Sequence, residues 1–419
     1  MNDKNIGKIG LAMMLTASLS THRASAIGLL IPNQDAFATA RGNAFTATAD
    51  NPSAIYYNPA GISQLDGAQF EVGILDYLGL NVSYKSPNGQ VSSDTKFAQV
   101  PIPQIYFTFT PTNFDQRVSF GLGVYAPFGL GVRWPQDGPL RTEALDSQVY
   151  YFTVNPVVSY KILDNLSFGI GPTINYAKLK FNRGLVDAVD KYQFEGDDIE
   201  AGFNAGLLWH PVQKWSFGAS YRMATKMDLS GTSTYSTGTA VYNSHTSTEV
   251  PFPEIVSAGV SFRPTPKWNL EVGIDYINWH TVGTLNFKGS ASSLNQAGLP
   301  FPDLSLPLNW HDSMQYKIGV TRYFANGWHA SAGYYYSAET ANDTYYTPGV
   351  PDSDLHVGSL GIGHNGEHWH WDLTGELIAG FARNITADPG NSNPITGVSA
   401  AGHYQLFIPT VSISVGYKF

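Results

Sequence analysis

The sequence has no cysteine among its 419 residues, which excludes a disulfide framework and thiol chemistry. Charged residues are also scarce, at 14% of the chain, whereas they make up about a quarter of an average soluble protein. Glycine (42 residues) and aromatic side chains (13%) are plentiful instead. This balance fits neither a disordered chain nor a typical soluble enzyme.

The sequence also lacks a long hydrophobic run. The longest apolar stretch, Leu11–Leu19, is shorter than the roughly 20 residues that a helix needs to cross a bilayer. The composition therefore does not indicate a helical membrane protein. Basic residues precede this stretch, and Ala24 and Ala26 follow it in an A-x-A arrangement. That layout predicts a signal peptide over residues 1–26, with cleavage after Ala26.

Export leaves an acidic chain. Removal of residues 1–26 takes away three basic residues and one acidic residue (Lys4, Lys8, Arg23 and Asp3), so the net charge changes from −9 to −11. An acidic exported protein is a poor candidate for binding nucleic acid. The absence of thiols suits passage through an oxidising periplasm, where they could mispair.

Apolar side chains recur at every second position along the chain. In "KWNLEVGIDY" (267–276) large apolar residues alternate with polar residues or glycine, as they do in 214–223, 368–377 and 412–419. This period indicates strands with one apolar and one polar face. The segments run to about ten residues, the length that a tilted strand needs to cross hydrocarbon. Their apolar faces often begin or end in an aromatic residue, as at membrane interfaces.

The connections between these segments are of two kinds. Six short turns (110–115, 163–165, 211–214, 263–267, 325–327 and 365–367) alternate with seven long polar stretches (82–96, 128–146, 182–197, 230–248, 288–309, 339–354 and 383–403). The pattern predicts an all-β fold, a 14-stranded antiparallel transmembrane β-barrel over residues 68–419, with both termini on the short-turn side. Closure is required because an open sheet edge in lipid leaves backbone groups unpaired. Such a barrel belongs in a bacterial outer membrane, where Phe419 would serve as the signal for the barrel assembly machinery.

Residues 27–67 lack the sequence pattern of a strand. They are rich in small and polar residues and contain two Asn-Pro turns around Tyr56 and Tyr57. A 14-stranded barrel has a lumen wider than its own side chains fill. We therefore expect this segment to plug the lumen; a disordered periplasmic tail is the alternative.

"NPSAIYYNPAGISQLDG" (51–67) resembles the hatch motif of FadL-type outer-membrane transporters of long-chain fatty acids and hydrocarbons. Four further segments resemble the family in order: "YAPFGLGVRW" (125–134), "EVGIDYINWHTVGTLNF" (271–287), "WHDSMQYKIGVTRYFANGWHASAGYYYS" (310–337) and "VPDSDLHVGSLGIGH" (350–364). The resemblance covers essentially all of residues 27–419.

The resemblance implies a hatch domain with its Asn-Pro-Ala turn at Asn58, Pro59 and Ala60. It also implies that ligands leave sideways into the bilayer through a kink in strand three. The candidate gate residues there are Gly121, Gly123 and Pro127, although a plain strand ending in a turn remains the alternative.

Capture of an apolar solute requires apolar side chains in the outer loops, because each CH₂ group prefers such a surface to water by about 0.8 kcal/mol. Two loops provide them. The candidate binding residues are Phe128, Leu130, Trp134 and Leu140 in the first loop, and Phe301, Leu304 and Leu306 in the second. The prolines of the second loop favour an exposed apolar surface; the alternative is that the loops cap the barrel.

A fatty acid would also need a cationic partner for its carboxylate, and Arg133 and Arg141 are the candidates beside the first loop. An uncharged hydrocarbon would need none.

His364, His368 and His370 in "HNGEHWHW" suggest a metal site, but their position in a turn opening a strand favours a polar lumen wall. We expect no metal site, no cofactor and no enzymatic activity, since no phosphate loop or nucleophile motif occurs. The expected partners are hydrophobic small molecules and membrane lipid, and the expected oligomeric state is a monomer. A general porin, a barrel lipid hydrolase and an adhesin or phage receptor are the alternatives.

Overall fold

A computed structural model describes residues 29–79, 81–112, 115–185, 189–289, 303–393 and 396–419. One antiparallel sheet dominates it. Its strands are β1 (Gly67–Leu78), β2 (Asn81–Lys85), β3 (Ser92–Asp94), β4 (Gln99–Thr110), β5 (Val118–Tyr125), β6 (Gly129–Arg133), β7 (Asp146–Leu163), β8 (Leu166–Arg183), β9 (Lys191–Val212), β10 (Trp215–Arg222), β11 (Thr225–Ser236), β12 (Val241–Phe252), β13 (Ile255–Thr265), β14 (Trp268–Ile277), β15 (Thr284–Gly289), β16 (Asp303–Pro307), β17 (Ser313–Tyr323), β18 (Trp328–Ser337), β19 (Leu355–Asn365), β20 (Trp369–Ile385) and β21 (Gly402–Lys418).

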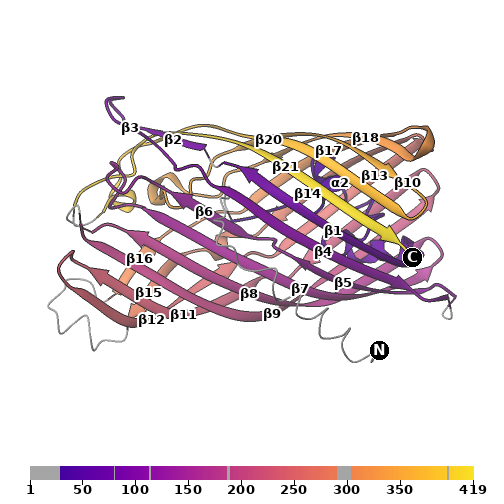
Figure 1. Cartoon of the computed structure of the whole chain (residues 1–419), viewed down its shortest axis with the longest axis horizontal. Helices are drawn as coiled ribbons and strands as arrows, with labels where there is room; N and C mark the ends of the chain where they lie inside the picture. Colours follow the sequence, from indigo (N-terminus) through magenta and orange to yellow (C-terminus); the bar gives the residue numbers. More distant parts are fainter. Residues whose placement is uncertain (1–28, 80, 113–114, 186–188, 290–302, 394–395) are drawn as a thin grey trace, which may run out of the picture.

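These segments form a closed barrel, because β1 pairs with β4 on one edge and with β21 on the other. Several barrel strands consist of two consecutive segments, such as β5 with β6 and β10 with β11, and the barrel has 14 strands in all. The predicted fold class is therefore confirmed. The strands lie steeply tilted side by side, with long hairpins at one end of the barrel (Figure 1).

Each predicted short turn joins two neighbouring barrel strands, and the C-terminus lies at the same end, called here the short-turn end (Figure 1). The other end is called the long-hairpin end. Several stretches predicted as loops there are instead strands: residues 230–248 belong mostly to the β11–β12 hairpin, and β9 already begins at Lys191. The sequence does not predict these strand extensions, because their outward faces are polar. They therefore lack the alternation of apolar and polar residues that marks a lipid-facing strand.

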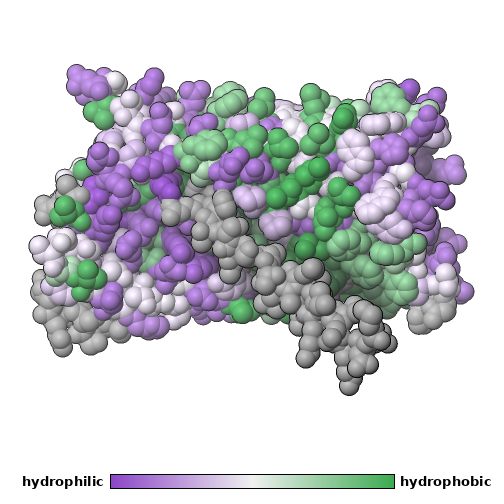
Figure 2. All heavy atoms as spheres, in the orientation of Figure 1, coloured by the Kyte–Doolittle hydropathy of each residue, from purple (hydrophilic) through white to green (hydrophobic). Residues whose placement is uncertain are grey.

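The burial pattern is that of a protein whose exterior is apolar. Along β7 the exposed residues include Phe152, Val154 and Val158, while Thr153 and Asn155 between them are buried. In Figure 2 the hydrophobic side chains gather over the half of the barrel nearer the short-turn end, and hydrophilic side chains cover the long-hairpin end. The long-hairpin end therefore projects beyond the apolar band.

Residues 29–66, called here the N-terminal segment, lie inside the barrel. They contain α2 (Ala36–Ala40), α3 (Ala54–Tyr57) and the 3₁₀ helix η1 (Pro59–Gln64). Nearly all of their side chains are buried. Helix α2 contacts β18 to β21 and β1, whereas η1 contacts β5 and β7 to β9 on another part of the wall. The other 3₁₀ helices among the described residues, η3 (Trp279–Thr281), η5 (Ala325–Gly327), η6 (Asp343–Tyr345) and η7 (Pro389–Asn391), lie in connections.

We predict that Val272→Arg, on the outward face of β14 where the side chain is 54% exposed, destabilises the barrel in lipid vesicles. An arginine facing hydrocarbon costs about 2–4 kcal/mol at mid-bilayer depth. The control is Val241→Arg at the β11–β12 hairpin, which should cost less than about 1 kcal/mol because it faces water. Urea unfolding in vesicles measures both, and equal costs would contradict the placement of β14 in lipid.

Candidate functional site

The inward face of the barrel changes from polar to apolar along each strand. On β1 the inward residues Gln69 and Glu71, near the short-turn end, are followed by Leu75 and Tyr77. Strand β21 runs in the opposite direction and shows the reverse order. Its inward residues are Tyr404, Leu406 and Ile408, then Thr410, Ser412 and Ser414. The lumen is thus divided into a polar zone at the short-turn end and an apolar zone at the long-hairpin end.

The apolar zone is one continuous cluster of buried side chains. It includes Leu29, Ile31, Leu75, Tyr77, Val100, Ile102, Phe128, Leu130, Val132, Trp134, Leu140, Val149, Tyr151, Leu179, Phe181, Phe194, Met227, Phe252, Ile277, Trp279, Phe287, Leu308, Trp310, Tyr335, Val357, Ile378, Leu406 and Ile408. Residues from nearly all barrel strands contribute, so the apolar zone surrounds the lumen axis. This apolar zone could be recognised from the sequence, because the inward-facing residues of β1 and β21 can be identified once the strand register is known.

The predicted binding residues of the first loop belong to this zone. Phe128, Leu130, Trp134 and Leu140 are each at most 2% exposed. The rings of Tyr151, Phe252 and Trp279 surround that of Phe128, with centroids 5.1, 5.1 and 6.1 Å away. The structure therefore brings these residues together inside the barrel and not on an exposed surface.

In the second loop, Leu304 and Leu306 lie on β16 and pack against the same zone. Leu308 and Trp310, which follow them, are buried in it. Phe301 lies outside the described residues. The expectation of an exposed apolar surface is therefore wrong for the described part of this loop, because β15 and β16 pair as a hairpin over the cluster.

Loops at the long-hairpin end close the apolar zone from above. The indole Nε1 of Trp134 donates to the backbone oxygen of Pro348 over 2.9 Å. The Thr142 and Thr396 hydroxyls lie 3.2 Å apart, and the Asn393 amide donates to the Thr142 carbonyl over 3.0 Å. The loops thus form a cap, the alternative raised for them from the sequence. Beneath it, burial raises the pKa of the Glu143 carboxyl to about 7, although Arg183 opposes the shift.

The two predicted carboxylate partners already interact with acidic residues of the protein. Arg133 Nε lies 3.6 Å from an Asp146 carboxylate oxygen. The Arg141 guanidinium lies 3.8 Å from an Asp190 carboxylate oxygen and donates to the Gln136 carbonyl over 3.0 Å. Both arginines therefore hold the cap loops and strand ends together.

Arg222, which the sequence analysis missed, is a better candidate. It lies at the end of β10 and lines a cavity of about 30 Å³ between the two zones. Its guanidinium donates to the Tyr125 hydroxyl over 3.0 Å and to the Tyr56 carbonyl over 3.2 Å, and stacks over both rings. Within the described residues, no carboxylate lies within ion-pair distance of it. The sequence does not indicate this environment of Arg222, because the residues that Arg222 contacts come from distant parts of the chain.

Strand three is interrupted beside this arginine. Strand β5 ends at Tyr125 and β6 begins at Gly129, so Pro127 lies within the break. Strand β4 pairs with β5 only over residues 105–109, which leaves 99–104 without a partner on that edge among the described residues. The backbones of Leu29 and Ile31 fill part of the break, in two 2.8 Å hydrogen bonds to Gly129 and Pro127. Gly121 and Gly123 lie within the intact ladder of β5 and face Ile55.

The predicted Asn-Pro-Ala turn anchors the N-terminal segment to the wall. The Asn58 amide donates to the carbonyls of Thr46 (2.8 Å) and Leu207 (2.9 Å), the latter on β9. Its oxygen accepts from the Ala60 N–H over 3.2 Å and so caps η1, where Pro59 occupies the first turn.

Inward glycines of the wall make this close approach possible. A Cβ atom added at Gly333 of β18 would collide with the backbone of Arg41 and Gly42. One added at Gly218 of β10 would collide with the Thr46 carbonyl. Backbone contacts as close as these leave no room for any side chain.

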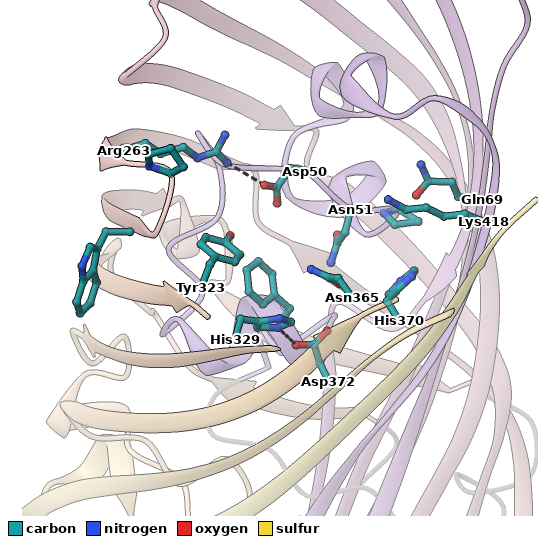
Figure 3. A pocket seen from close by; sticks show the side chains of 14 residues that line it. Asp50, Asn51, Gln69, Arg263, Tyr323, His329, Asn365, His370, Asp372 and Lys418 are labelled. Carbon is teal, nitrogen blue, oxygen red and sulfur yellow. Dashed lines mark hydrogen bonds and ion pairs between the residues drawn. The ribbon is translucent and has the colours of Figure 1, made fainter. Parts of the chain in front are cut away.

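A polar cavity of about 440 Å³ lies beneath the N-terminal segment at the short-turn end. Arg263 pairs with Asp50 across it over 2.8 Å, and His329 pairs with Asp372 over 2.6 Å (Figure 3). The same view shows that His370, Gln69 and Lys418 line it on the side away from Arg263. Water at this end of the barrel can therefore reach the contacts between segment and wall.

The three predicted histidines do not lie together. His370 is buried in the lumen wall and lies 3.0 Å from the Glu71 carboxylate. His368 precedes β20, is exposed, and contacts the Lys418 carbonyl, so it does not share the inward face of His370. His364 packs against Trp328. The described residues contain no group of three or more His, Asp or Glu side chains arranged to hold a metal ion.

None of the helices in the described part of the chain combines the length and the apolar character that crossing a bilayer requires.

One serine–histidine pair bears on the hydrolase alternative. Ser230 Oγ lies 3.2 Å from a ring nitrogen of His245, on the exposed β11–β12 hairpin. Among the described residues, no carboxylate forms an ion pair with this histidine to orient its ring. The pair therefore lacks the third member that activates a serine nucleophile.

The closed barrel, its apolar zone and the segment inside it define an outer-membrane transport barrel. The chain belongs to the family of outer membrane protein transport proteins (OMPP1/FadL/TodX), whose model matches residues 17–392. The resemblance seen in the motifs is thus confirmed.

Individual relatives are distant. The long-chain fatty acid transport protein of Escherichia coli O6:H1 is 21% identical over 352 residues, which cover 74% of this chain and 76% of the relative. The structure of a Pseudomonas aeruginosa FadL homologue has a TM-score of 0.81 at 17% identity and covers 94% of this chain and 100% of the other. The Ralstonia pickettii toluene transporter TbuX has a TM-score of 0.69 at 17% identity, covering 91% and 97%. These structures show the same fold.

We predict that Gly333→Val displaces the N-terminal segment and raises ion conductance in planar bilayers. The added side chain would meet backbone of the segment, and such overpacking costs about 1–3 kcal/mol. Gly358→Val on β19 is the matched control, because a Cβ there meets nothing within 4 Å. If both variants conduct like the parent, the contact at Gly333 does not hold the segment in place.

Proposed function

We propose that this protein is a passive outer-membrane channel for hydrophobic compounds, long-chain fatty acids or hydrocarbons. One observation carries the proposal: the inward face of the barrel is apolar over its outer half. A channel for polar solutes gains nothing from such a lining, because water and sugars are poorly solvated by it. A solute with many CH₂ groups gains about 0.8 kcal/mol for each group that it buries.

The route that we propose begins at the cap loops. These loops cover the apolar zone, and the cavities next to Leu30 and Pro32 measure only about 30 and 40 Å³. Each holds about one water molecule. A ligand therefore enters only if the cap and some lining side chains move aside, and Phe128, Leu130, Trp134, Leu140, Phe301, Leu304 and Leu306 are the residues that we propose it meets.

We propose that the N-terminal segment acts as the hatch and that strand three provides the exit. Asn58, Pro59 and Ala60 anchor the hatch to the wall, and Ile31 bonds to Pro127 at the break. A shift of the segment would free this break and the unpaired edge of β4, and the ligand would leave sideways into lipid. Gly121 and Gly123 face Ile55 and allow the segment to lie close to strand three.

Arg222 is the proposed partner for a carboxylate. It sits where the apolar zone meets the N-terminal segment, so a fatty acid could place its head there and its chain in the apolar zone. A hydrocarbon would bind without this contact. We further propose that ligands pass chemically unchanged, that the chain acts as a monomer, and that exposed Phe419 is the assembly signal.

The transport function predicts that Val357→Asn, in the apolar zone, slows uptake of hydrophobic compounds by roughly five- to thirtyfold. An amide in an apolar path costs about 1–2 kcal/mol, which corresponds to that range. Val241→Asn on the exposed β11–β12 hairpin is the control and should leave uptake unchanged. Uptake of alkanoates, alkanes and aromatics by a deletion strain carrying each variant is the measurement. Rapid swelling of liposomes in small sugars would instead support a general porin.

Arg222→Met should weaken binding of long-chain alkanoates by about ten- to a hundredfold, because a hydrogen bond to a charged group contributes about 1.5–3 kcal/mol. Binding of an alkane of equal length should not change. Arg222→Lys keeps the charge and should recover part of the affinity. Equal losses for alkanoate and alkane would show that Arg222 supports the structure and not the carboxylate.

A further inference from the structure

Arg322 is an arginine on the outward face of the barrel. The preceding residue, Thr321, is fully buried in the lumen wall, so the Arg322 side chain projects from the opposite face of β17. Strand β17 ends one residue later, at Tyr323, close to the short-turn end. An outward arginine is costly at the middle of a bilayer but tolerated near its surface, where the lipid headgroups lie.

Aromatic rings orient this guanidinium. Arg322 is the cross-strand partner of Trp268 on β14, and its guanidinium carbon lies 4.7 Å from the centre of the indole ring and 5.8 Å from that of the Phe324 ring. Trp268, Phe324 and the neighbouring Trp328 are between 39% and 55% exposed. Exposed aromatic residues at the ends of barrel strands mark the boundary between hydrocarbon and headgroups. The stacked guanidinium therefore lies at the depth of the headgroups.

The Arg322 guanidinium has no acceptor within the described residues, where it forms neither an ion pair nor a hydrogen bond. Six other arginines do pair with carboxylates: Arg41, Arg117, Arg133, Arg141, Arg263 and Arg383. The N–H groups of Arg322 are thus available to a partner from the surroundings. A guanidinium binds phosphate through two parallel N–H donors, and phosphate is the anionic group of a lipid headgroup.

Two further basic side chains lie on the same part of the short-turn end. Exposed Lys267 ends the β13–β14 turn, and its carbonyl accepts from the Tyr323 N–H over 2.9 Å. Exposed Lys214 ends the β9–β10 turn, and its carbonyl accepts from the Arg263 N–H over 2.8 Å. Strands β10, β13, β14 and β17 are consecutive neighbours, so they span about 14 Å at about 4.8 Å for each step. Lys214, Lys267 and Arg322 are called here the basic rim.

The basic rim carries positive charge without acidic partners. None of its three side chains forms an ion pair within the part of the chain that the structure describes. Arg263 lies beside it but is neutralised by Asp50 over 2.8 Å. Elsewhere at the short-turn end, Arg117 is neutralised by Asp164 over 3.0 Å. Unpaired basic residues at a membrane surface attract anionic lipids, whose headgroups supply the missing negative charge.

The orientation of the barrel decides which leaflet the basic rim meets. In the outer membrane the short-turn end faces the periplasm, if the long hairpins face outward as the sequence predicts. The leaflet on that side consists of phospholipid, whereas the sugar-bearing lipid lies in the outer leaflet. The phosphate within reach of Arg322 is then that of a phospholipid.

We propose that the basic rim is a binding site for an anionic phospholipid of the periplasmic leaflet, with the Arg322 guanidinium on the lipid phosphate and the two lysines beside the rest of the headgroup. A zwitterionic headgroup fits less well, because its cationic group would lie among positive charges. The site is on the outside of the barrel and separate from Arg222 in the lumen. It requires the barrel and its orientation but not the proposed transport function.

The test is native mass spectrometry of the full mature chain in detergent, titrated separately with phosphatidylglycerol and phosphatidylcholine. The parent should bind the anionic lipid about tenfold more tightly or better. Arg322→Gln should lower this preference about fivefold or more, because it removes one charge near the surface together with the bidentate contact. Arg322→Lys keeps the charge and should retain part of the preference.

Two further variants separate a built site from plain charge. Arg117→Gln removes the same charge at the same end of the barrel, but from an arginine that Asp164 already neutralises, so the preference should change less than about twofold. Trp268→Leu keeps every charge and removes the ring that orients Arg322. It should lower the preference about two- to fivefold, as expected for loss of an exposed cation–π contact.

Equal losses in Arg322→Gln and Arg117→Gln would show that net charge alone attracts the lipid, and the site would be refuted. Equal binding of the two lipids by the parent would refute it as well. A further titration adds inorganic phosphate in excess; if this displaces phosphatidylglycerol, the ligand is free phosphate and not a lipid. If lipid A binds more tightly than phosphatidylglycerol and Arg322→Gln abolishes that difference, the basic rim belongs to the outer leaflet and the proposal is wrong.

Discussion

The rest of the structure depends on closure of the backbone hydrogen-bond ladder between β1 and β21. Within lipid no water can satisfy an unpaired N–H or C=O, so the sheet must meet itself. Closure also separates two chemical tasks. Since neighbouring residues point to opposite faces, the outward face only has to suit lipid, and the inward face can take any composition without affecting insertion.

The inward face carries two different linings, one polar and one apolar. The N-terminal segment has irregular backbone with many polar groups, and each of these needs a partner when buried. Wall residues such as Glu271, Thr374 and Ser216 supply them in the polar zone, where Glu271 accepts from two backbone N–H groups of the segment. An apolar ligand needs the opposite lining. The two zones therefore meet along one boundary, and Tyr56, Tyr125 and Arg222 lie on it.

The outward face could be predicted from the sequence because it follows one rule along every strand. Trp268, Leu270 and Val272 alternate with buried Asn269 and Glu271 as expected. The site was predicted less completely. Phe128 and Trp134 were identified from their apolar character, but their burial follows from loops that fold over them. Arg222 was missed because its significance depends on Tyr56, 166 positions away along the chain.

The break in strand three raises the question of how a barrel in lipid tolerates an unpaired edge. Part of the answer lies in Pro101 and Pro103 of β4. The N–H of Val100 points towards β1, where it donates to Asp76, so alternate positions 101 and 103 point to the open edge. Proline has no N–H to leave unsatisfied there. The rest of the answer lies across the break, where the backbones of Leu29 and Ile31 form hydrogen bonds with backbone groups of strand three. Because the N-terminal segment itself forms these hydrogen bonds, a movement of the segment would also free the backbone of strand three, which is the coupling that the proposed exit requires.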